Sequence, residues 1–149
     1  MRKPDNVTVV PCTSKNVFRK WLEFMRPYHK LTDREMDIAA AFIRHRFALS
    51  KVISDDTILD SVLLSEDTKK KIREECNITL QHFQVILGSL RKNKVIVNNR
   101  INPKFIPSLK EDSDYLTLMF YFKIEDESKD LPKDSKEIES KDWRSWKCL

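Results

Sequence analysis

Glycine is almost absent from the chain, since Gly88 is the only one among 149 residues. Phosphate-binding loops of the Walker and dinucleotide types need several glycines, so the sequence excludes both. The sequence also lacks an apolar run of ~18 residues, the length that a membrane-spanning helix requires. Its first 15 residues, MRKPDNVTVVPCTSK, contain no apolar segment of the kind found in secretory signals. We therefore expect neither a membrane span nor a secretory signal.

Cysteine and histidine are few and far apart. No CxxC pair is present, and the histidines share no metal-binding spacing. An odd number of distant cysteines is typical of reduced thiols in a cytosolic context. We therefore expect no disulfide, no metal and no cofactor. The residues concerned are Cys12, Cys76, Cys148, His29, His45 and His82.

The acidic pairs do not suggest catalysis. Asp55–Asp56 and Glu74–Glu75 are adjacent in sequence, and neighbours on a helix point in different directions. No nucleophile has a base at a useful local spacing. We expect a protein that is not an enzyme and takes no small-molecule substrate.

The net charge of +5 is unevenly distributed. Residues 1–30 hold seven basic and two acidic side chains, whereas residues 31–124 hold 15 basic and 13 acidic ones. Residues 125–142 hold four basic and eight acidic side chains. This distribution predicts a basic N-terminal arm with a helix (1–30), a nearly neutral core (31–124) and an acidic tail (125–149).

Apolar spacing predicts helices in the first two thirds of the chain. Ser14 is expected to cap a helix over residues 15–25 that Pro27 ends. Thr32 and Glu35 have the spacing of a capping box before the most periodic helix, in which the apolar positions are Met36, Ala39, Ala40, Ile43 and Phe47.

Three further helices are expected. One is capped near Asp55 and turns Ile58, Val62 and Leu63 inward, and the next starts at Ser65. After a turn at Asn77, Thr79 caps a helix that extends to about Lys92, with Leu80, Phe83, Leu87 and Leu90 on one stripe. Gly88 lies near that stripe, where it would permit close helix approach.

The periodicity then changes to two. KVIVNN predicts a short strand, and DYLTLMFYFKI alternates strictly, with Leu116, Leu118, Phe120, Phe122 and Ile124 on one face. The segment between them, RINPKFIPSLKEDS, is too long for a tight hairpin. The expected fold is α+β, with three to five helices, a wing of two or three strands, and extended arms at both ends.

Residues 31–124 resemble a winged helix-turn-helix. The resemblance rests on LTDREMDIAAAFI at a helix start, on CNIT between two helices, and on LRKNKVI before the wing. The low glycine content and asparagine-rich wing are also similar to the ring or connector proteins of crAss-like bacteriophages. This second resemblance implies a virion protein that forms a ring in the connector or tail barrel.

A DNA-reading function is the alternative. Gln81, His82 and Gln84 are able to hydrogen-bond base edges, while basic residues nearby contact phosphates. The basic candidates are Lys69, Lys70, Lys71, Arg91 and Lys92. Against this, residues 31–124 carry little net charge, and phosphate contacts supply most non-specific affinity.

The tail favours assembly with proteins. Trp143, Arg144 and Trp146 belong to residue types enriched at interface anchors. Apolar residues cover more than one face of the first helix, so either this helix packs deeply on its own domain or it shows apolar surface to a partner, and Phe18 and Trp21 are candidates for the partner contact. A tail that folds back on its own chain, and an adaptor for a cellular enzyme, remain open.

We therefore expect a non-enzymatic structural protein that forms a homo-oligomer and binds other structural proteins. Its expected location is the virion, and otherwise the cytoplasm. Nucleic acid is the second choice of partner.

Overall fold

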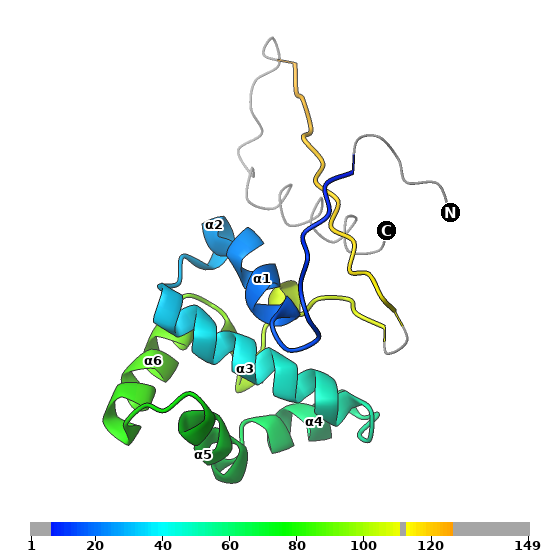
Figure 1. The fold of residues 1–149 in the computed structure, drawn as a ribbon. Helices are drawn as coiled ribbons and strands as arrows, with labels where there is room; N and C mark the ends of the chain where they lie inside the picture. The colour runs from blue at the N-terminus through cyan, green and yellow to red at the C-terminus, as the bar shows by residue number, and fades with distance from the viewer. Residues whose placement is uncertain (1–6, 111–112, 127–149) are drawn as a thin grey trace. The chain divides into compact units, whose positions relative to one another are not determined.

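The computed structural model describes residues 7–110 and 113–126 of the chain (Figure 1). The chain divides into two units, Met1–Ser108 and Leu109–Leu149. The described part of the first unit contains six α-helices and a two-stranded antiparallel sheet, which confirms the α+β class. In the second unit, the described residues belong to neither a helix nor a strand.

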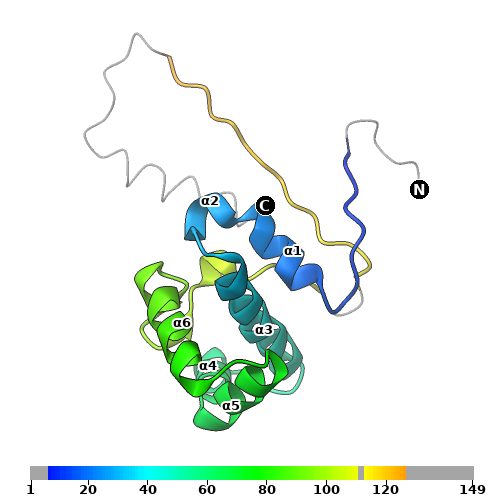
Figure 2. The same cartoon turned by 60° about the vertical axis from the view of Figure 1, so that its left-hand side comes forward.

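The central element of the first unit is α3 (Asp33–Ser50), and α1, α4, α5 and α6 all pack against it (Figure 2). The expected capping box is confirmed, because Glu35 N donates to Thr32 Oγ1 at 3.3 Å and Thr32 N donates to Glu35 Oε1 at 2.9 Å. Ile38, Ala41 and Phe42 are buried in addition to Met36, Ala39, Ala40 and Ile43 of the expected stripe, whereas Phe47 is only half-buried. Helices on several sides of α3 explain why its buried surface is wider than one stripe.

Two of the remaining elements precede α3 in the chain, and the others follow it. They are α1 (Val17–Phe24), α2 (Arg26–His29), α4 (Asp56–Leu63), α5 (Glu66–Glu75), α6 (Leu80–Lys92), β1 (Ile96–Val97), β2 (Arg100–Ile101) and a short 3-10 helix, η1 (Pro103–Phe105).

The N-terminal helices belong to the core, which corrects the expected boundary at residue 31. α1 packs on α3, and Trp21 Nε1 donates a hydrogen bond to the Phe105 carbonyl at 2.8 Å. The N-cap of α1 is Asn16, not Ser14. Pro27 lies in the first turn of α2, where a proline is tolerated because no helical hydrogen bond needs its nitrogen.

His29 fixes the junction between α2 and α3. Its Nε2 lies 2.7 Å from the Leu22 carbonyl, and Leu31 N donates to its Nδ1 at 3.0 Å. Burial lowers the pKa of His29; the Leu22 carbonyl opposes this, and Arg26 and Arg19 add to the lowering. The arrangement therefore suits a neutral imidazole that carries its proton on Nε2.

The two strands of the sheet are not both the ones that the sequence predicted. β1 and β2 form a tight hairpin with Ile96 opposite Ile101, joined by Asn98 and Asn99. Both asparagines have positive φ, 53° and 58°, as a two-residue type I′ turn requires. The expected strand over residues 114–124 is not formed, so the second wing strand is the early β2.

α4 begins as expected but turns a different face inward. Asp55 Oδ1 accepts hydrogen bonds from Thr57 N at 2.8 Å and Ile58 N at 3.2 Å. Leu63 is buried, as expected, but Ile58 is 54% exposed and Leu59 takes its place in the core. The face is therefore shifted by one residue, which also buries Asp60.

Asp60 of α4 forms ion pairs with one residue of α3 and one residue of β2. Arg46 Nε of α3 lies 3.3 Å from Asp60 Oδ1, and Arg100 Nε of β2 lies 3.3 Å from Oδ2. The Arg100 contact is an ion pair without hydrogen-bond geometry, since Oδ2 has no hydrogen-bond partner in the structure. The side chains of Asp60 and Arg46 are only 5% and 14% exposed, so solvent screens their pair weakly.

Asp60→Ala is expected to lower the free energy of unfolding by ~3–5 kcal/mol, because Arg46 would lose its compensating charge in a buried position. Urea unfolding followed by circular dichroism measures the change. Asp56→Ala is the matched control: Asp56 also pairs with Arg46, at 3.8 Å, but its side chain is 73% exposed. The control should lose less than ~1 kcal/mol. Equal losses in the two variants would contradict the role given to Asp60.

Candidate functional site

α5 and α6 are consecutive capped helices joined by a short turn. Ser65 Oγ accepts from Thr68 N, and Thr79 Oγ1 accepts from His82 N at 3.2 Å. Asn77 adopts the expected left-handed conformation, with φ of 53°. Arg34 of α3 donates to the Cys76 carbonyl at 2.5 Å. The turn is therefore held to the central helix, and this fixes where α6 begins.

α6 buries one side and exposes the other. Its buried residues are Phe83, Ile86, Leu87 and Leu90. Leu80, expected on this stripe, is instead 58% exposed. Gln81, His82 and Gln84 are exposed, as the DNA-reading alternative requires, but the apolar Val85 is exposed on the same face, which speaks against that alternative. The outer face of α6 is therefore accessible but almost uncharged at its N-terminal end.

Gly88 does not serve close packing inside the unit, contrary to expectation. It is exposed, and a Cβ added there would meet no atom within 4 Å. Its φ is not positive. Nothing within the described fold therefore requires glycine at this position.

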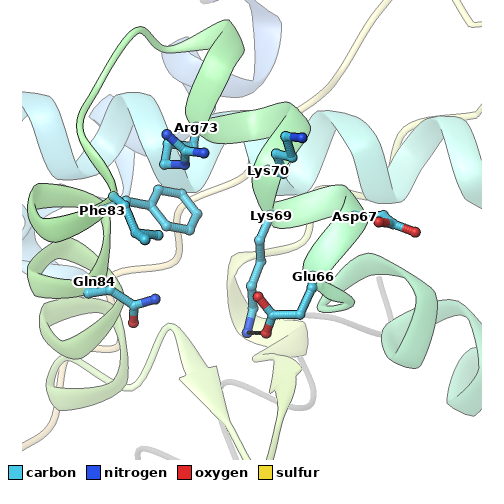
Figure 3. Close-up of a pocket in the computed structure, with 8 residues that line it drawn as sticks. Glu66, Asp67, Lys69, Lys70, Arg73, Phe83 and Gln84 are labelled. Carbon is cyan, nitrogen blue, oxygen red and sulfur yellow. Dashed lines mark ion pairs between the residues drawn. The ribbon is translucent and has the colours of Figure 1, made fainter.

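A groove of about 240 Å³ lies between α5 and α6 (Figure 3). Phe83 points from α6 toward α5, and Lys69 pairs with Glu66 at 3.7 Å. Acidic and basic side chains both border the groove, so it does not have the one-sided charge of a phosphate site. The lining residues are Glu66, Asp67, Lys69, Lys70, Arg73, Leu80, Phe83 and Gln84.

The structure brings together only some of the nucleic-acid candidates. Lys69 and Lys70 share the groove with Gln84, whereas Lys71, Gln81 and His82 do not line it. The Lys69 side chain is only 17% exposed. Arg91 and Lys92 are exposed on the last turn of α6.

The part of the chain that forms α6 and the wing is basic, although the net charge of residues 31–124 as a whole is small. No acidic residue occurs between Cys76 and Lys110, while the acidic residues of the core lie on other elements. The near balance over residues 31–124 therefore hides a basic stretch. Its six basic residues are Arg91, Lys92, Lys94, Arg100, Lys104 and Lys110.

Of the five partner-binding candidates, the structure describes only Phe18 and Trp21. Phe18 and Trp21 are 3% and 7% exposed, so the chain's own core uses them. This corrects their expected role as partner contacts, because their apolar surface is already covered by the same chain. Trp143, Arg144 and Trp146 lie outside the described residues.

A second candidate surface is the segment 113–126, here called the aromatic segment. It is drawn as an extended trace (Figures 1 and 2). Tyr115, Tyr121, Phe122 and Ile124 are 76%, 59%, 89% and 94% exposed. The alternation in the sequence predicted a strand over these residues, and the structure shows none there.

The described residues hold neither a candidate metal site nor a membrane-spanning helix. They contain no group of three His, Cys, Asp or Glu side chains placed to hold a metal ion. No described helix is long and apolar enough to cross a membrane. Comparison with protein-family models, curated proteins and solved structures found no match for the chain.

Gly88→Ala is expected to raise the free energy of unfolding by up to ~1 kcal/mol, because alanine is the better helix former and its Cβ meets open space. Thermal and urea unfolding measure the change. Gln81→Ala, on the same exposed face, should change stability by less. A destabilised Gly88→Ala protein would show that the fold itself needs the glycine.

Proposed function

We propose that this protein is a non-enzymatic assembly protein whose aromatic segment is covered by another protein chain. The observation that carries the proposal is the exposure of large apolar side chains from Tyr115 to Ile124. Contiguous apolar surface of this kind in a soluble protein marks an interaction site.

The chemistry of the aromatic segment suits strand pairing. Its residues alternate in the period of a β-strand, and aromatic and β-branched types favour strands. Among the described residues, no other backbone group hydrogen-bonds to the main chain of residues 116–119. A partner that supplies a strand edge would satisfy these groups and cover the apolar side chains together.

The resemblance to ring and connector proteins of crAss-like phages supports a virion setting for this assembly. In such a ring, the basic residues 1–30 of one copy would meet the acidic residues 125–142 of another. Complementary charge of this kind sets register and orientation more than affinity. The α+β unit would act as the block that these segments join, with a cytoplasmic location as the alternative.

Replacing Tyr121, Phe122 and Ile124 together by serine is expected to lower the mass of the protein in solution to that of one chain, 17.7 kDa. The reason is that the variant loses the apolar surface that association buries. Light scattering coupled to size exclusion measures the mass of both proteins.

The control is the triple variant Val52→Ser, Ile58→Ser, Val85→Ser, which removes exposed apolar residues of the first unit. It should keep the mass of the wild type. Thermal unfolding should show that the helices of both variants remain folded. A wild type that stays at 17.7 kDa at every concentration would contradict the proposal.

Duplex DNA binding is the second candidate, favoured by the absence of acidic residues between Cys76 and Lys110. In this arrangement α6 presents Gln81 and Gln84 to base edges. Arg91, Lys92 and Lys94 contact phosphates at the end of α6 and the start of the wing. A helix-turn-helix from α5 to α6, followed by the β1–β2 wing, is the corresponding proposal for the fold.

Arg91→Ala with Lys92→Ala is expected to weaken duplex binding and to reduce the slope of log K against log salt by up to ~0.9 for each phosphate that the variant no longer neutralises. Fluorescence anisotropy at several salt concentrations measures both quantities. Lys51→Ala, an exposed lysine at the far end of α3, is the control and should leave the slope unchanged. Absence of binding to mixed duplex DNA at low salt would exclude this function.

A further inference from the structure

We infer that a surface of the first unit binds single-stranded nucleic acid, with an unpaired base stacked on Tyr28 and phosphates held by Lys30, Lys94 and Lys104. These four residues, here called the lysine surface, come from α2 and its C-cap, from the turn after α6, and from η1. The lysine surface is independent of the proposed assembly function, which uses the aromatic segment.

Three elements that are far apart in the sequence meet at the lysine surface. The Lys104 ammonium of η1 lies 5.0 Å from the centre of the Tyr28 ring on α2. Asn102, two residues before Lys104, donates from its side-chain amide to the Lys94 carbonyl at 2.8 Å. The contacts of η1 therefore bring the turn after α6 to the side of α2 that carries Tyr28.

Lys30 joins the same surface through the residue before it. The His29 ring packs on the Phe105 ring with 5.7 Å between their centres, and Phe105 directly follows Lys104. Lys30 and Lys104 are therefore each adjacent in sequence to one ring of a contacting pair. Tyr28 is 53% exposed and Lys30 is exposed, so a ligand is able to reach both.

The lysines of this surface carry charge that the described fold does not neutralise. Among residues 7–110 and 113–126, no carboxylate forms an ion pair with Lys30, Lys94 or Lys104. The acidic residues in the first turn of α3 are engaged elsewhere: Asp33 pairs with Arg26 at 2.5 Å, and the capping box holds the other. The charges of the three lysines are therefore available to an anionic ligand.

Two of these lysines occupy backbone positions that lysine disfavours. Lys30 and Lys94 have φ of 54° and 64°, in the left-handed region. The other described residues with positive φ are Asn77, Asn98 and Asn99, and asparagine tolerates this region best after glycine. Backbone strain of this kind persists where a ligand site uses the residue. A lysine at a position that suits asparagine better indicates that the lysine charge is used.

An exposed aromatic ring among unpaired cations favours a single strand over a duplex. Unpaired bases stack on aromatic side chains while cations follow the phosphates, whereas the bases of a duplex must first be unstacked. The lysine surface is also separate from the base-reading face of the duplex alternative. Gln81 lies in the first turn of α6 and Lys94 lies beyond its last turn, at opposite ends of a helix that is ~20 Å long.

Fluorescence anisotropy with the full-length chain tests the ring. The probe is a labelled oligothymidine of ~16 nucleotides, enough for one such site, and the comparison is its duplex with oligoadenine. The single strand is expected to bind more tightly than the duplex. Tyr28→Ala should weaken single-strand binding by ~5-fold or more, because one stacked base is lost. Tyr28→Phe retains the ring and should bind as the wild type does.

Lys30→Asn with Lys94→Asn tests the charges without straining the backbone, because asparagine suits the left-handed region. Circular dichroism should show that this double variant keeps its helices. Its slope of log K against log salt should fall in magnitude by up to ~0.7 for each phosphate that it no longer neutralises on a single strand.

The matched control is Lys15→Asn with Lys51→Asn, which removes two other exposed lysines. Both lie near the opposite end of α3, because the ring of Phe47 contacts the Lys51 ammonium and the first turn of α1. This control variant loses the same net charge as the test variant. It should keep the salt slope of the wild type, because its lysines lie away from the lysine surface.

The inferred ligand is overturned if the single strand does not bind at low salt, or if the duplex binds more tightly. It is also overturned if the two lysine variants lose equal affinity, or if Tyr28→Ala binds as the wild type does. Binding of a labelled peptide of residues 125–142 in place of the single strand would assign the lysine surface to an acidic protein segment instead. Single-strand binding by a protein that stays at 17.7 kDa would contradict the assembly function and support the lysine surface.

Discussion

The position of the wing depends on one buried carboxylate. Asp60 of α4 is the shared ion-pair partner of Arg46 on the central helix and Arg100 on β2. A buried charge is tolerated only where its partners compensate for lost water, so the three elements must keep their relative placement. The hairpin itself has only two residues in each strand and few hydrogen bonds of its own. The ion pair to Asp60 and the burial of Val95, Ile96 and Ile101, more than sheet pairing, therefore locate the hairpin against the helices.

Four of the five expected helix caps are confirmed, whereas the cap of α1 and the long-range contacts were not predicted. The caps at Thr32, Asp55, Ser65 and Thr79 depend on residues within one turn, and the structure confirms each of them. The burial of Trp21 depends on a hydrogen bond to Phe105, which is 84 positions away. No local pattern records such a partner, which is why the sequence left open whether the first helix packs on its own domain or contacts a partner.

The wing shows why periodicity can mislead. Residues 114–124 have the stronger alternation, yet the hairpin forms at the weaker sequence around Asn98 and Asn99. The geometry of the turn determines where the hairpin forms, because both asparagines tolerate the positive φ that a two-residue hairpin needs. The basic stretch near the candidate site was missed for a related reason. The net charge was summed over residues 31–124, so the acidic residues of other elements offset the basic residues of this stretch. Segment-by-segment counting would have revealed it.

His29 makes the helical unit sensitive to acid. Both of its ring nitrogens already have backbone partners, so an added proton on Nδ1 would displace the Leu31 amide. Its pKa in the folded chain lies below the ordinary value of 6.5, so the unfolded chain takes up the proton first. The stability associated with this group is complete above that value and is lost as the pH falls through it toward the lower folded pKa. Mild acidification would therefore loosen the α2–α3 junction before the rest of the helical unit unfolds.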